Sequence, residues 1–223
     1  MSSPQPFTRV LSPPLNFLPP NTPPHLFSAT VEHFTSIPWC AKLLSVDPAA
    51  PNNHSQPIPF ISQSFNPESP EHDQFVGTTL TSPQALRRGL GVFRPEDPEH
   101  TRDPTRPITK VISLYTVGNG LCGFKGILHG GMIMTLFDEV TGSVVEINMA
   151  LGKKWIQSGL MMVTGSLSVK FLRPVPVNSE VCATAWLEKI EGRKAMIRAE
   201  ITGSEGERMA TAESVWVVIA PKV

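Results

Sequence analysis

Residues 129–142, which run HGGMIMTLFDEVTG, are the stretch of sequence that decides the fold. From Met132 to Val145, apolar residues occupy positions on nearly every side of a helix extending over residues 129–149. A helix that is apolar all round is buried. The sequence therefore predicts a long central helix with a sheet wrapped around it.

Two adjacent carboxylates, Asp138 and Glu139, interrupt this apolar helix and lie roughly 100° apart around its axis. Burying an unpaired charge is costly, and the buried group usually responds by shifting its pKa. One interpretation places both carboxylates on an exposed edge of the helix. We favour a functional carboxylate for Asp138, and for Glu139 the two interpretations stay open.

The glycine pair Gly130 and Gly131 falls in the first turn of the same helix. N–H groups there have no intrahelical partner, and the helix dipole is positive at that end. Without a Cβ, glycine allows a ligand carbonyl to approach the backbone closely. We interpret the pair as an oxyanion site, and the alternative is that it only eases a tight junction between loop and helix.

Strands flank the helix on both sides in sequence. β-Branched and alternating residues predict them at 109–117, 163–172, 180–190, 194–202 and 208–219. In strand 163–172 the alternation places Val163, Leu167, Val169 and Phe171 on one face. The last strands are joined by short turns, which require antiparallel pairing. The predicted class is α+β, with an antiparallel sheet around the helix.

The N-terminal half differs in composition, because twenty of the 23 prolines lie at or before Pro107. We predict that residues 1–28 are disordered. Residues 29–108 are predicted as an extension with short helices at 29–44 and 82–92, Pro-rich loops and a charged linker at 96–107. Residues 109–223 form the predicted folded domain.

Bulk composition excludes several classes of protein. Lys+Arg and Asp+Glu both number 19, so the chain lacks the basic excess of a nucleic-acid binder. No apolar run reaches the roughly 18 residues of a membrane span. The three scattered cysteines indicate neither a disulfide framework nor a metal site, and favour a reducing compartment. We expect a cytoplasmic protein, with mitochondrial targeting as the alternative because the N-terminus is poor in acidic residues.

The segment FKGILHGGMIMTLFDEVTG, residues 124–142, resembles the signature helix of PaaI-like hotdog thioesterases in the 4-hydroxybenzoyl-CoA thioesterase superfamily. SVKFLRP at residues 168–174 is similar to the strand of that family that ends in Arg-Pro, and EGRK at residues 191–194 is similar to its next hairpin turn. The resemblance covers about 110 residues. The first 108 residues lie outside the pattern of the domain and resemble the extensions of fungal members only vaguely.

This resemblance implies a hotdog fold and hydrolysis of an acyl thioester without a cofactor or a metal. The helix N-terminus at Gly131, with Gly130 beside it, would polarise the thioester carbonyl. Asp138 would act as general base or nucleophile, and Thr164 would orient the water or the carboxylate.

The remaining candidate residues have lesser roles. His129 would shape the loop rather than act as a base, and some members carry an asparagine where this chain has Gly123. Glu139 is placed at the substrate site. Arg193 and Lys194, together with Lys153 and Lys154, are candidates for contacts with the phosphates of CoA, and each is equally compatible with ordinary solvated surface.

The expected partners are an acyl-CoA or acyl-carrier thioester and a second copy of the chain. Asp138 lies nine residues beyond His129, or roughly 13 Å along the axis. A general base must lie within about 3 Å of its proton or one water away. Two chains with antiparallel helices can meet this constraint, so we expect a homodimer or tetramer with composite sites.

Two other interpretations compete with hydrolysis. Gly118-x-Gly120-x-x-Gly123 formally matches a dinucleotide-binding fingerprint, but the antiparallel sheet that follows it does not suit a βαβ unit. A hotdog module that binds acyl-CoA or a polyketide intermediate without turning it over is the non-enzymatic alternative.

Overall fold

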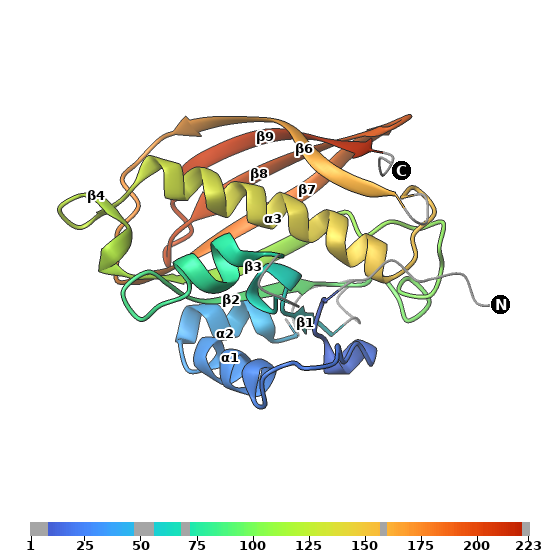
Figure 1. Ribbon diagram of the computed structural model, residues 1–223, viewed down its shortest axis with the longest axis horizontal. Coiled ribbons are helices and arrows are strands. Elements are labelled where there is room, and N and C mark those ends of the chain that lie inside the picture. The colour runs from blue at the N-terminus through green and yellow to red at the C-terminus, as the bar shows by residue number, and fades with distance from the viewer. Residues whose placement is uncertain (1–8, 47–55, 68–71, 157–159, 220–223) are drawn as a thin grey trace.

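The computed structural model describes residues 9–46, 56–67, 72–156 and 160–219, and its centre is a sheet curled around one helix (Figure 1). The helix is α3 (Gly130–Ala150). The sheet is antiparallel throughout, in the order β1-β2-β3-β7-β8-β9-β6. Its strands are β1 (Ile58–Phe60), β2 (Leu86–Phe93), β3 (Lys110–Val117), β6 (Met161–Phe171), β7 (Ser179–Glu191), β8 (Lys194–Thr202) and β9 (Arg208–Ile219). The predicted α+β hotdog architecture is confirmed.

Helix α3 is buried because apolar residues face nearly every side of it, as its sequence predicted. Leu136, Phe137, Val140 and Val144 have no exposed surface, and they join residues of β3, β7, β8 and β9 in one core. His129 caps the helix at its N-terminus, so the predicted limits of 129–149 hold to within one residue. No helix in the described ranges is long and apolar enough to cross a membrane.

Strand β6 contains a β-bulge that the sequence pattern did not reveal. Its pairing with β9 shifts between Thr164 and Ser166, so that Gly165 is the extra residue. Because a one-residue shift moves every following side chain to the opposite face, Thr164 and Leu167 both point toward α3. The prediction that Val163 shares a face with Leu167 is therefore wrong, and Val163 is instead an exposed apolar residue.

The N-terminal extension adds β1 and β2 to the sheet, beside β3. Our prediction of a helix at 82–92 is wrong, because residues 86–92 pair with β3 in an extended conformation. The two glycines of this strand leave room for aromatic rings. A Cβ on Gly89 would lie 2.4 Å from Phe65, and one on Gly91 would lie 2.4 Å from Phe60.

Two short helices, α1 (Leu26–Thr35) and α2 (Pro38–Leu44), cover the outer face of β2 and β3 (Figure 1). The single helix predicted at 29–44 is thus broken in two before Pro38. A second apolar cluster joins these helices to the sheet, and it includes Phe34, Cys40, Leu90 and Leu114. The smaller elements are the 3-10 turns η1 (Pro13–Leu15), η2 (Gln63–Phe65) and η4 (Asn119–Leu121), the π-helical turn η3 (Phe75–Leu80), and the hairpin of β4 (Cys122–Phe124) and β5 (Ile127–Leu128).

The predicted disorder of residues 1–28 is wrong for the part that the structure describes, which begins at residue 9. The Arg9 guanidinium is buried and donates to the Pro20 carbonyl at 2.7 Å and to the Asn66 carbonyl at 2.8 Å. Leu11 pairs with Ile61 through two backbone hydrogen bonds. The prolines are compatible with this packing, because a proline carbonyl still accepts a hydrogen bond, as that of Pro20 does.

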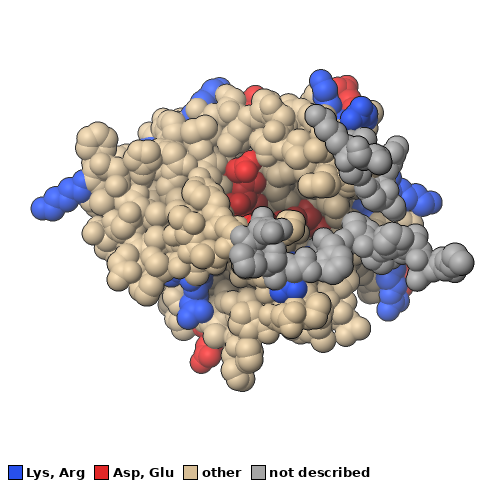
Figure 2. All heavy atoms as spheres, in the orientation of Figure 1, with Lys and Arg blue, Asp and Glu red and all other residues tan. Residues whose placement is uncertain are grey.

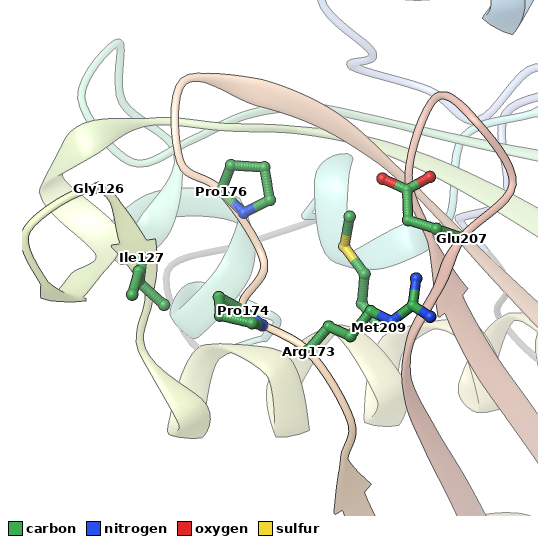
Figure 3. A pocket seen from close by; sticks show the side chains of 7 residues that line it. All are labelled: Gly126, Ile127, Arg173, Pro174, Pro176, Glu207 and Met209. Atoms are coloured by element: carbon green, nitrogen blue, oxygen red, sulfur yellow. The ribbon is translucent and has the colours of Figure 1, made fainter.

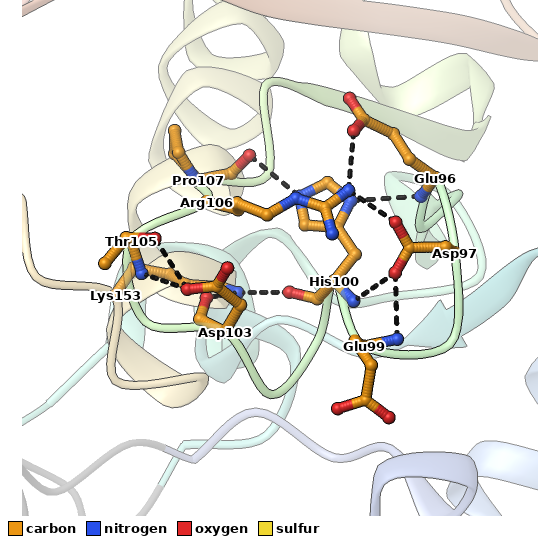
Figure 4. Close-up of polar contacts among 9 residues, drawn as sticks. All are labelled: Glu96, Asp97, Glu99, His100, Asp103, Thr105, Arg106, Pro107 and Lys153. Carbon is orange, nitrogen blue, oxygen red and sulfur yellow. Dashed lines mark hydrogen bonds and ion pairs between the residues drawn. The ribbon is translucent and has the colours of Figure 1, made fainter.

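The charged segment 96–107 is also ordered, in a loop folded around Lys153 (Figure 4). The Lys153 ammonium is buried and donates to the carbonyls of His100 at 2.5 Å and Asp103 at 2.7 Å. Asn148 exchanges two hydrogen bonds with the backbone of Ile108 and so ties the end of the loop to α3. Lys153 therefore holds the loop in place, and the suggestion that it meets CoA phosphates is wrong.

We expect the N-terminal arm to contribute measurably to stability. Leu11→Ala should lower the free energy of unfolding by roughly 2–5 kcal/mol, because Leu11 is only 4% exposed and the truncation leaves a cavity. Leu18, 62% exposed on the same arm, provides the matched control, and Leu18→Ala should change stability by less than about 0.5 kcal/mol. Urea denaturation of the three proteins measures both values, and equal small effects would mean that the arm does not pack as described.

Candidate functional site

The N-terminus of α3 is closed by the side chain that precedes it. His129 is the N-cap, and its Nδ1 accepts a hydrogen bond of 3.0 Å from the Gly131 N–H. Because Nδ1 accepts, the ring hydrogen of a neutral imidazole lies on Nε2. The positive end of the helix dipole and the first-turn N–H groups remain concentrated here, as expected for a site that attracts a polarised oxygen.

A cavity of about 420 Å³ opens beside this helix end. Its polar end is formed by His129 and Gly131, and Thr135 lies one turn further along α3. The other lining residues are Phe75, Gly120, Leu121, Cys122 and Met132. Asp138 does not line this cavity, although it stands on the same helix.

Asp138 instead forms a pair with Thr164 of β6. The Thr164 hydroxyl donates to Asp138 Oδ1 at 2.6 Å, and both side chains are only partly exposed. The bulge at Gly165 is the reason that Thr164 points toward α3, since unbroken alternation would group it with the outward-facing Ser166. The structure thus brings together two of the residues that the sequence singled out.

Trp216 of β9 lies next to this pair and packs against α3. Its Nε1 donates to the Thr141 hydroxyl at 3.0 Å, and a Cβ on Gly142 would lie 3.2 Å from its ring. Gly142 therefore permits the close approach of α3 to β9.

Glu139 faces a different part of the protein, the N-terminal extension. The Ser64 hydroxyl of η2 donates to Glu139 Oε2 at 2.5 Å. Two turns further along α3, Glu146 accepts from the Gln63 N–H at 3.4 Å. In Figure 2, acidic side chains are visible in a hollow over the middle of α3.

Burial sets the protonation of both these glutamates. It raises the pKa of Glu139 to about 7, with the Ser64 hydrogen bond opposing the rise and the charge of nearby Asp138 adding to it. Burial likewise raises the pKa of Glu146 well above its ordinary value, with the charge of Glu139 as the next contribution. The neutral form of both carboxyl groups is therefore favoured where the extension covers α3. The sequence had led us to expect Glu139 at the substrate site.

The polar residues proposed for CoA lie elsewhere in the chain. Arg193 and Lys194 lie at the turn between β7 and β8. This turn is at the end of the sheet where β6 begins, near the C-terminal end of α3. The Arg193 guanidinium donates to the Val218 carbonyl at 2.6 Å, which fixes it against β9. Within one chain these residues do not approach Gly131.

A second cavity, of about 520 Å³, lies at the opposite end of the sheet from that turn (Figure 3). Pro174 and Pro176 lie between Ile127 on one side and Met209 on the other. Arg173 and Glu207 supply its charged groups. None of the predicted site residues lines it.

The sequence did not point to Phe75 or Ser64, which approach α3 from the extension. Both lie in a Pro/Asn/Ser-rich region or next to it, where no periodic pattern marks a contact with the domain. The local signal was the apolar pair Phe75 and Val76, which follows a polar stretch.

Comparison with known proteins gives one family. Residues 125–210 match the model described as the thioesterase superfamily. Verlamelin biosynthesis protein B of Lecanicillium is 30% identical, over 56% of this chain and 62% of that protein. The acyl-coenzyme A thioesterase THEM4 of mouse is 30% identical, over 51% of this chain and 45% of that protein, so the chain spans about half to three fifths of these relatives. Among solved structures, a hypothetical thioesterase of Streptococcus pneumoniae with coenzyme A has a TM-score of 0.44 and 22% identity, over 52% of this chain and 86% of that one.

The raised pKa of Glu139 predicts a pH dependence of stability. The folded state retains the proton from the ordinary pKa of 4.5 up to about 7, so wild-type stability falls as the pH rises through this window. Glu139→Gln keeps an acceptor for Ser64 and has no charge to bury. Its free energy of unfolding should match the wild type at pH 4.5 and exceed it at pH 8.5 by roughly 1–3 kcal/mol.

Urea denaturation at several pH values measures this difference. Glu205 lies on an exposed turn, so Glu205→Gln should follow the wild-type profile throughout. If Glu139→Gln shows no gain at high pH, the Glu139 carboxyl is not held in the buried environment that the structure describes.

Proposed function

We propose that this chain, whose residues 125–210 match the thioesterase superfamily, hydrolyses an acyl-CoA, or a related acyl thioester, to the free acid and a thiol. The observation that carries the proposal is the hydrogen bond between Thr164 and Asp138. It orients one carboxylate on an otherwise apolar helix that also presents a glycine pair at its N-terminus.

The proposed reaction divides the work between these two groups. The thioester carbonyl oxygen lies at the N-terminus of α3, where the Gly130 and Gly131 N–H groups and the helix dipole stabilise its developing charge. Water attacks the carbonyl carbon as Asp138 takes its proton, or Asp138 itself attacks and water releases the acyl group. In the first route the C–S bond breaks after the water has added; in the second it breaks as Asp138 forms the acyl anhydride, before water hydrolyses that anhydride. In both routes the thiolate leaves and takes up a proton. The reaction needs no cofactor or metal.

His129 has a positioning role in this scheme. Its ring occupies the Gly131 N–H in the free protein, so the ring must turn away before that donor can reach a substrate oxygen. Removing a cap of this kind costs about 1 kcal/mol, which a stronger bond to an oxyanion can offset.

We propose that each site is shared between two copies of the chain. Gly131 and Asp138 are seven residues apart, or roughly 10 Å along α3, and Asp138 does not reach the cavity at Gly131. A partner with an antiparallel helix supplies the missing carboxylate. The same arrangement brings the partner's β7–β8 turn, with Arg193 and Lys194, toward the end of the sheet where CoA phosphates would lie.

Strand β6 is the edge that suits this partner. In the part of the chain that the structure describes, β6 pairs only with β9, while β1 and β2 cover the edge of β3. Large apolar side chains stand exposed along β6, with Met161 58% and Phe171 55% exposed. An apolar, unpaired edge is a template for another strand, and a second copy of β6 fits it by two-fold symmetry.

A module that binds an acyl-CoA or a polyketide-type intermediate without hydrolysis is the second candidate. The capping of the Gly131 N–H by His129 favours it, because this donor cannot serve as an oxyanion site while the ring stays in place. Turnover of palmitoyl-CoA, benzoyl-CoA and an acyl-carrier-protein thioester separates the two candidates and identifies the carrier. For the location we propose the cytoplasm, on the basis of the few scattered cysteines.

Asp138→Asn should lower kcat by at least ~100-fold, because general-base contributions of this kind are about 10²–10⁴-fold. Glu139→Gln is the matched control, since Glu139 is adjacent in sequence but faces Ser64. It should change kcat far less. Steady-state hydrolysis of the acyl-CoA panel measures both, and near-normal turnover by Asp138→Asn would reject Asp138 as the catalytic carboxylate.

Mixing two inactive variants tests the shared site. Asp138→Asn lacks the carboxylate, and Gly131→Val fills the space that the carbonyl needs; a Cβ there already lies 3.0 Å from His129 Nδ1. When equal amounts are unfolded and refolded together, half of the dimers should be mixed. Each mixed dimer holds one intact site, so about one quarter of wild-type activity should return. Mixed dimers that form without recovering activity would show that one chain supplies the whole site.

A further inference from the structure

Phe75 is an exposed aromatic residue on a firmly anchored turn. It opens the π-helical turn η3 and is 57% exposed, while its neighbour Val76 is 2% exposed and belongs to the main core. The Phe75 ring is therefore free to contact a molecule that binds beside the turn, and aromatic rings bury a large apolar area in such contacts.

The position of this turn is set by close packing against η2. A Cβ on Gly77 would lie 2.6 Å from the Ser64 carbonyl oxygen and 2.8 Å from the ring of Pro67. Ser64 in turn donates to Glu139 of α3. The contact of Gly77 with Ser64 and the hydrogen bond of Ser64 to Glu139 therefore connect the turn that carries Phe75 to α3.

Phe75 lines the cavity at the N-terminus of α3. Leu121 and Met132, 9% and 6% exposed, form apolar surface in the same cavity, and His129 and Gly131 form its polar end. Its volume of about 420 Å³ lies within the range of small-molecule sites, roughly 300–1,000 Å³. A ligand with an apolar group attached to a carbonyl matches this distribution.

We propose that the N-terminal extension completes the acyl-binding site, with Phe75 as the apolar wall that selects acyl groups larger than acetyl. The identification of the ligand as a thioester rests on the proposed function. With the carbonyl oxygen at the Gly131 N–H, the acyl chain runs between Phe75 and Met132. Selectivity is therefore supplied by a segment outside residues 125–210, which match the family model.

Binding of S-decyl-CoA, a thioether that cannot be hydrolysed, tests the wall without relying on turnover. Wild-type protein should bind S-decyl-CoA more tightly than CoA. Phe75→Ala should weaken S-decyl-CoA about tenfold, the scale of small changes in an apolar pocket, and leave CoA unchanged. Phe75→Leu should give a smaller loss and serves if the alanine variant folds poorly. Phe124, 79% exposed on the β4–β5 hairpin and not part of this cavity, provides the control Phe124→Ala, which should change neither ligand.

Cys122 reports directly on occupancy. It is exposed and lines the cavity, whereas Cys40 and Cys182 are buried. S-decyl-CoA should slow alkylation of Cys122 by iodoacetamide in the wild type more than CoA does, and Phe75→Ala should abolish that difference.

The outcomes separate this inference from the proposed function. Wild-type protein that binds S-decyl-CoA no better than CoA, or a Phe75→Ala variant that weakens both ligands equally or neither, overturns the acyl wall. Tight, Phe75-dependent binding of S-decyl-CoA by a protein that hydrolyses no thioester supports the wall and contradicts hydrolysis only.

Discussion

The burial of α3 is the constraint on which the rest of the structure depends. Its apolar residues face in nearly every direction, so one sheet must curl around it to remove them from water. The order β3-β7-β8-β9-β6 provides this wrapping, and the extension covers part of the surface that remains. A polar side chain on a buried side of α3 is therefore held in a low-dielectric environment and needs a specific partner.

Asp138 and Glu139 are adjacent on this helix, but their carboxylates accept hydrogen bonds from different elements and lie in different environments. Asp138 receives its hydrogen bond from Thr164 of β6, next to the apolar edge of the sheet. Glu139 receives its hydrogen bond from Ser64 of the extension, where burial raises its pKa. Two residues about 100° apart around one helix thus face different surroundings, one beside the β6 edge and the other against the N-terminal extension.

The extension changes what the domain can present to other molecules. Its strands cover the edge of β3, and its helices α1 and α2 cover the outer face of β2 and β3, which leaves β6 as the apolar edge. Through η3 it also places Phe75 in the cavity beside Gly131. Residues that look like a separate, loosely organised arm in the sequence therefore take part in both the sheet and the candidate site.

The sequence by itself determined the central helix and the five strands around it, because local periodicity encodes these features. Tertiary structure decided the rest. The bulge at Gly165 exists because of the way β6 pairs with β9, and that bulge turns Thr164 toward Asp138. Residues 86–93 form a strand by pairing with β1 and β3, and residues 9–28 are held by contacts with Ile61 and Asn66. Such outcomes depend on partners distant in sequence, whose pairing energy overrides local propensity and leaves no local pattern.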